Sequence, residues 1–111
     1  MAITTDKEEI VQMKRVILSA DGPLGLYLVP DVVADSLHEY CLAFCDWLND
    51  SPDAAKYRHF SKEIGNYLAY SQEDFIDYLN KFVFPMEQSE KLAVIGWPLQ
   101  DEYKTLPRFN F

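Results

Sequence analysis

The stretch DVVADSLHEYCLAFCDWLND, residues 31–50, decides the predicted fold because its apolar residues recur at helical intervals. The spacings are four, three, one, three and four residues, through Val33, Leu37, Tyr40, Cys41, Phe44 and Leu48. Trp47 widens this apolar face. We therefore predict one long amphipathic helix from Asp31 to Asp50 that packs its apolar face into a core.

Start and stop signals around this stretch predict three more helices. Thr5 and Glu8 have the spacing of a capping box, which predicts a first helix from about Asp6 to Ala20. Ser51 and Pro52 begin a short third helix through about His59. Ser71 caps a fourth helix that ends before Pro85. The expected core side chains of that helix are Phe75, Ile76, Leu79, Phe82 and Val83.

Short apolar segments between these helices predict a small sheet. Residues 24–29 are a candidate extended segment, and residues 67–70 and 92–95 are candidate strands because of their aromatic and branched side chains. Residues 61–66 are expected to form a loop. The sequence thus predicts an α+β fold for a single domain, residues 1–111: mainly helical, with about four helices and a two- or three-stranded sheet.

Composition indicates an ordered cytoplasmic protein. Hydrophobic residues make up 49% of the 111 residues, which is enough for a core. The first nine residues do not resemble a signal peptide, and no apolar run approaches the ~20 residues that span a bilayer. The two cysteines, Cys41 and Cys45, are one helical turn apart and fit reduced thiols better than a disulfide.

Acidic residues are concentrated on the long helix. The net charge is −8, which argues against nucleic acid or membrane as a direct partner and leaves a basic protein partner open. Residues 31–53 contain six acids and no Lys or Arg. Five of the six fall within an arc of about 100° on the predicted helix: Asp31, Asp35, Glu39, Asp46 and Asp50.

This acidic stripe has two interpretations. It is either a solvated face, met by Lys14 or Arg15 from the first helix, or a docking surface for a basic partner. Like-charge pairs four residues apart each cost about 0.2 to 0.5 kcal/mol of helix stability. Asp46 and Asp50 also lie near the end of the helix where the dipole disfavours acids. Helix stability therefore does not explain the stripe.

A metal site is the alternative. His38, Cys41 and Cys45 lie on one flank of the predicted helix, but a structural zinc site needs a fourth ligand, such as His59 or a carboxylate. Burial of the two cysteines as small apolar groups is the simpler interpretation, so we predict no cofactor. The chain has two histidines and no nucleophile motif or phosphate-binding loop, which predicts that it is not an enzyme.

Residues 106–111, LPRFNF, either tuck against the domain or form an interaction tail, and we expect them to tuck because free Phe side chains promote aggregation. The chain is similar to a loose group of small bacterial proteins of unknown function. The matching segments are EYCLAFCDWL (39–48), SPDAAKYR (51–58), EDFIDYLNKFVFP (73–85), Gly96-Trp97 and LPRFNF. The resemblance implies no site residues.

Together these features predict a non-enzymatic acidic protein-binding domain whose helix face docks on a basic partner. An inhibitor or immunity-type protein of a bacterium or phage, which masks a nucleic-acid-binding protein, has this character. The partner-binding residues would be Asp31, Asp35, Glu39, Asp46 and Asp50. A small metal-binding sensor or enzyme that uses His38, Cys41 and Cys45 is the alternative function.

Overall fold

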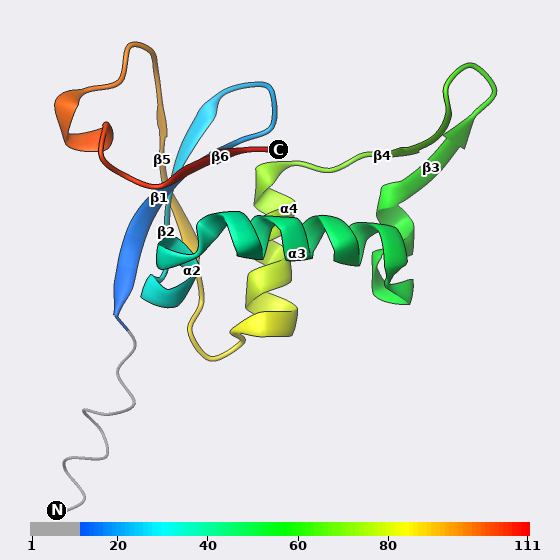
Figure 1. Ribbon diagram of the computed structural model, residues 1–111, viewed down its shortest axis with the longest axis horizontal. Helices are drawn as coiled ribbons and strands as arrows, with labels where there is room; N and C mark the ends of the chain where they lie inside the picture. Colours follow the sequence, from blue (N-terminus) through cyan, green and yellow to red (C-terminus); the bar gives the residue numbers. More distant parts are fainter. Residues whose placement is uncertain (1–11) are drawn as a thin grey trace, which may run out of the picture.

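The computed structural model describes residues 12–111, which form a four-stranded sheet, a separate two-stranded hairpin and helices (Figure 1). The order along the main sheet is β5-β2-β1-β6. No helix in the described range could cross a membrane. In chain order, the elements are β1 (Met13–Ser19), β2 (Leu24–Pro30), α2 (Asp31–Asp35), α3 (Leu37–Asp50), the 3-10 helix η1 (Pro52–Tyr57), β3 (Arg58–Ser61), β4 (Gly65–Leu68), α4 (Gln72–Tyr78), the π-helical turn η2 (Leu79–Val83), β5 (Glu90–Ile95), the 3-10 helix η3 (Asp101–Tyr103) and β6 (Arg108–Asn110).

The prediction of a mainly helical α+β fold with a two- or three-stranded sheet is wrong. Six strands lie in the described part of the chain, four of them in one sheet. In that sheet β1 pairs antiparallel with β2, β2 pairs antiparallel with β5, and β6 pairs parallel with β1. The predicted strand at residues 92–95 is part of β5, and the extended segment 24–29 is part of β2.

The predicted first helix is replaced by strand β1. Residues 6–11 of that prediction lie outside the described residues, and from Met13 to Ser19 the chain is extended. Val16, Ile17 and Leu18 are all 0% exposed because both faces of this strand are covered. A strand buried on both faces has a continuous apolar run instead of alternation, so its sequence pattern does not distinguish it from a helix.

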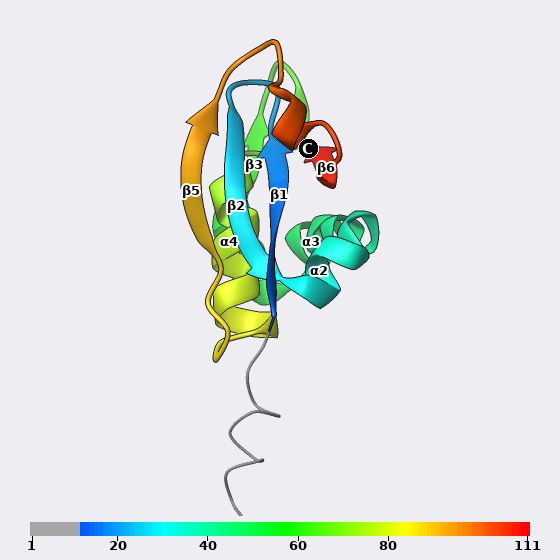
Figure 2. The ribbon, with the colours of Figure 1, turned by 90° about the vertical axis from the view of Figure 1, so that its left-hand side faces the viewer.

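The larger hydrophobic core lies between one face of the sheet and helices α3 and α4 (Figure 2). Val16 and Leu18 from β1 and Tyr27 and Val29 from β2 form the sheet side of this core. The Tyr27 ring crosses the backbone of Gly25, where any Cβ would clash with it. Glycine at position 25 therefore allows a fully buried tyrosine to lie flat on the sheet.

The opposite face of the sheet has a smaller core under residues 96–107, which we call the covering segment. Ile17, Leu24 and Leu26 from the sheet pack there against Leu99 of the covering segment. Ile95, Tyr103 and Leu106 complete this cluster at its margin. Strands β1 and β2 thus contribute side chains to both cores.

The predicted long helix is present but breaks at Ser36. Ser36 has φ −130° and ψ 43°, so α2 ends at Asp35 and α3 begins at Leu37. The Ser36 N–H donates to the carbonyls of Val32 and Val33 at the end of α2, and the Ser36 carbonyl accepts from the Tyr40 N–H at the start of α3. Within α3 the predicted apolar face is correct: Leu37, Cys41, Phe44 and Leu48 are buried.

The other helices are partly as predicted. Ser51 accepts a hydrogen bond from the Asp53 N–H and Pro52 is the first helical residue, but the helix is a 3-10 helix that ends at Tyr57. The fourth helix has its capping box at Ser71. Its last turn is π-helical, and there Phe82, which was expected in the core, is 49% exposed. The wider π turn changes the angular spacing of the side chains.

Candidate protein-binding surface

The outward face of α3 carries acids beside one exposed apolar side chain. This apolar side chain is Leu42, which is 46% exposed. Glu39 precedes Leu42 by three residues and Asp46 follows it by four, so all three side chains share one side of the helix. Asp50 extends the face by a further turn, and all three acids are exposed. We call Glu39, Leu42, Asp46 and Asp50 the α3 face.

The structure separates two of the five predicted acids from this face. Asp35 lies on α2, and its Oδ1 is 2.8 Å from Lys14 Nζ on β1. This hydrogen bond and the attraction of Asp35, together with that of Asp31, raise the pKa of Lys14. Asp31 is half-buried at the start of α2. The solvated-face interpretation has Lys14 or Arg15 meet the stripe from a helix; Lys14 meets it from a strand, and Arg15 instead pairs with Glu102.

The three acids of the α3 face have no basic neighbour at ion-pair distance among residues 12–111. The ion pairs found there instead join Lys14 to Asp35, Arg15 to Glu102, Lys91 to Glu73 and Lys104 to Asp101. The α3 face is thus the part of the predicted stripe with uncompensated charge.

The chain matches no protein-family model, no curated protein and no solved structure. The resemblance to small bacterial proteins therefore stays a prediction.

The three candidate metal ligands do not form a site. Cys41 is completely buried in the larger core, and burial raises the pKa of its thiol. Cys45 is half-buried, and burial also raises the pKa of that thiol. His38 is exposed, and its ring lies 5.7 Å from that of Phe109. Within the described residues no group of three or more His, Cys, Asp or Glu is placed to hold a metal ion.

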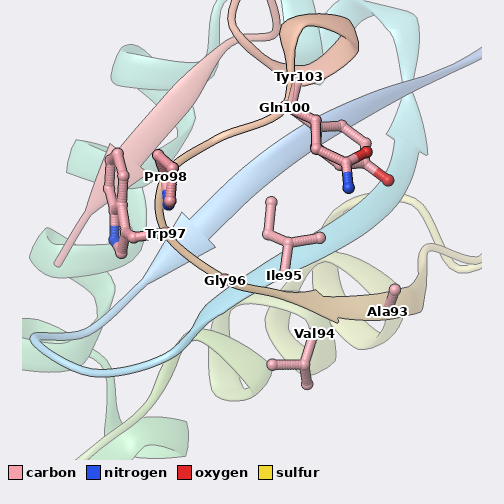
Figure 3. Close-up of a pocket in the computed structure, with 8 residues that line it drawn as sticks. All are labelled: Ala93, Val94, Ile95, Gly96, Trp97, Pro98, Gln100 and Tyr103. Carbon is pink, nitrogen blue, oxygen red and sulfur yellow. The ribbon is translucent and has the colours of Figure 1, made fainter.

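A hollow of about 410 Å³ lies between β5 and the covering segment (Figure 3). Ile95, Gln100 and Tyr103 point into the same region, whereas Trp97 projects to the other side of Pro98. Trp97 is 68% exposed, and the Arg108 guanidinium lies 5.8 Å from its ring. The lining includes no carboxylate, histidine or cysteine, so the hollow offers no acid and base pair for catalysis.

The second feature that could bind a protein is one that the sequence analysis missed. Strands β3 and β4 form a hairpin that extends past the C-terminal end of α3 (Figure 1). Its exposed apolar side chains are Phe60 (69%), Ile64 (68%) and Tyr67 (40%). We call residues 58–68 the arm.

A signal for the arm was present in the sequence. Two short runs with aromatic side chains, RHFS and GNYL, are separated by three residues, and Gly65 has a positive φ of 78°. This pattern is typical of a hairpin with a three-residue connection. The predicted third helix, through about His59, and the predicted loop over residues 61–66 assigned parts of RHFS to two different elements. The pairing of the two strands was therefore not predicted.

Proposed function

We propose that this protein is a non-enzymatic, cytoplasmic binding protein that docks a basic protein partner through the α3 face. The single observation that carries the proposal is that Glu39, Asp46 and Asp50 are exposed and uncompensated on one side of α3, beside the exposed Leu42. Protein interfaces combine buried apolar side chains with polar and charged groups at their border, and the α3 face offers both kinds of group.

The charge of the α3 face defines the class of partner. Carboxylates on one helix face attract a surface rich in Lys and Arg, and such surfaces are typical of proteins that bind nucleic acid. A protein that covers such a surface acts as an inhibitor or an immunity-type protein. The cost of placing Asp46 and Asp50 near the C-terminal end of α3 supports a role for these acids other than helix stability.

The test compares two variants with the same change in net charge. The first carries Glu39→Lys and Asp46→Lys on the α3 face. The control carries Glu90→Lys on β5 and Asp101→Lys on the covering segment, both exposed and away from α3. Tagged proteins are used to capture partners from a lysate of the source cells at low and at high salt.

We expect the control to capture a basic protein that the α3 variant does not capture. We also expect the unmodified protein to capture less of this basic protein at high salt. Circular dichroism of both variants checks that the fold is unchanged. Equal retention of the same partner by both variants would exclude the α3 face as the docking surface.

A further inference from the structure

The arm is anchored only near its base. Arg58 donates from Nη1 to the carbonyls of Leu48 and Ser51, both at 2.9 Å, which ties the start of β3 to the C-terminal end of α3. The Ala69 N–H donates to the Tyr57 carbonyl across the base of the hairpin. Beyond these bonds, the main contacts of β3 and β4 are with each other.

An isolated two-stranded hairpin is marginally stable in water. The arm has, in addition, two open strand edges and three exposed apolar side chains, Phe60, Ile64 and Tyr67. The His59 and Tyr67 rings stack at 5.4 Å, but this contact leaves both side chains exposed. Exposed apolar groups on an open edge indicate a surface that another protein covers.

The charge of the arm identifies what could cover it. Residues 58–68 contain Arg58 and Lys62 against Glu63, a net charge of +1 in a chain whose total is −8. Two arms would therefore repel each other, and a nucleic acid would be repelled by the rest of the chain. A complementary acidic surface with an exposed apolar side chain beside it exists on this same protein, at the α3 face.

We propose that the arm of one copy docks on the α3 face of a second copy, reciprocally, in a two-fold symmetric dimer. Phe60 and Ile64 cover Leu42, and Lys62 lies beside the carboxylates of Glu39, Asp46 or Asp50. The strand fits within the length of the face: β3, from Arg58 to Ser61, extends roughly 10 Å, and Glu39 to Asp50 extends roughly 16 Å along a helix.

Symmetry makes the contact reciprocal, so the dimer covers two arms and two α3 faces instead of one of each. The inference rests on the proposed function in that both use the α3 face. It adds that the protein covers this face itself, so a basic partner competes with self-association.

The experiment measures the mass of the full-length protein by light scattering across micromolar concentrations. We expect a shift from 12.9 kDa toward twice that value as concentration rises. Phe60→Ser, Lys62→Glu and Asp46→Lys should each weaken dimerisation at least tenfold. Met86→Ser and Lys81→Glu are the matched controls, because both side chains are exposed and lie outside the arm and the α3 face, and they should leave it unchanged.

A charge swap makes the test specific. In a mixture of the Lys62→Glu and Asp46→Lys proteins, the heterodimer has two different contacts. The arm of the first protein, which carries Lys62→Glu, meets the α3 face of the second, which carries Asp46→Lys. The unmodified arm of the second protein meets the unmodified α3 face of the first. We expect the mixture to form a heterodimer although neither variant dimerises alone.

A protein that stays monomeric at every concentration, or variants that dimerise like the controls, would overturn the proposal. So would a mixture that fails to associate when the single variants are folded. Partner capture is scored separately. If Lys62→Glu is monomeric and still captures the basic partner, both the partner-docking proposal and the dimer proposal are supported. If the parent protein is monomeric and captures the partner, only the dimer proposal fails.

Discussion

At the scale of single residues, Tyr27 and Glu73 connect the sheet to α4. Tyr27 is completely buried, and its hydroxyl donates to Glu73 Oε2 at 2.7 Å. Burial, followed by this hydrogen bond, raises the pKa of Tyr27. Lys91 Nζ on β5 lies 3.1 Å from the same carboxylate oxygen. The carboxylate therefore satisfies a buried hydroxyl and pairs with a lysine on the edge strand.

This arrangement predicts a pH dependence of stability. The Tyr27 hydrogen bond, and then Lys91, hold the pKa of Glu73 below its ordinary value of 4.5. The folded state thus binds fewer protons than the unfolded state, so this stabilisation is present above the unfolded pKa and is lost as pH falls through the folded one. The free energy of unfolding, measured in urea from about pH 6 to pH 3, should fall less for Glu73→Gln than for the parent.

Glu90→Gln is the control, since Glu90 is exposed on β5 and forms no ion pair among the described residues. Its pH profile should follow that of the parent. Parallel profiles for parent and Glu73→Gln would show that the Tyr27 contact contributes no differential stability.

The sequence identified residue types better than it identified their partners. The acids of the α3 face and the buried Cys41 follow from helical spacing alone, and the structure places both as that spacing predicts. The pairing of Asp35 with Lys14 joins residues 21 positions apart, and it depends on β1 and α2 being neighbours. Local periodicity contains no such information, so Asp35 could not be separated from the α3 face in advance.

At the scale of elements, prediction worked where one face of an element is buried and the other is solvated. Helix α3 has this character, so its apolar period is visible. Strand β1 is buried on both faces from Val16 to Ser19, so its period is lost there. Strand β6 is only three residues long and forms because β1 offers an open edge beside it. Its residues alone predicted a tucked tail, which the structure confirms, but not a strand.

The tucked tail predicts a loss of stability on truncation of Phe111. Its ring packs against those of Phe44, Tyr70, Phe75 and Phe109, at centroid distances of 5.7, 6.0, 5.5 and 4.8 Å. Phe111→Ala keeps the backbone bond from residue 111 to the Ser19 carbonyl and removes only the ring. Because the ring is partly exposed, we expect a loss of about 2 to 3 kcal/mol in the free energy of unfolding, below the usual range for a fully buried Phe.

Met86→Ala serves as the control because Met86 is 86% exposed, and urea unfolding should leave its stability within about 0.5 kcal/mol of the parent. If Phe111→Ala costs no more than Met86→Ala, the tail does not contribute to the core in solution.

At the scale of the whole molecule, the sheet is covered on both sides and the charges are segregated. Residues 31–53 carry a net charge of −6, and the arm that follows them is basic. The two hydrophobic clusters share strands β1 and β2, since Ile17 faces one cluster while Val16 and Leu18 face the other. The covering segment 96–107 therefore packs on one face of strands whose other face is covered by α3 and α4.

This sharing predicts that both sides of the sheet unfold together. The two tryptophans report on them separately: Trp47 packs against the larger core, and Trp97 lies in the covering segment beside Arg108. We expect Trp47→Phe and Trp97→Phe, each with one fluorescent indole left, to give urea midpoints that coincide with the midpoint of circular dichroism in the same protein. Loss of either cluster exposes apolar side chains of β1 and β2 and removes support from the other. In the Trp47→Phe protein, Trp97 fluorescence could instead change at a lower urea concentration than the circular dichroism. This result would mean that segment 96–107 opens as a unit of its own, with the sheet held by α3 and α4 alone.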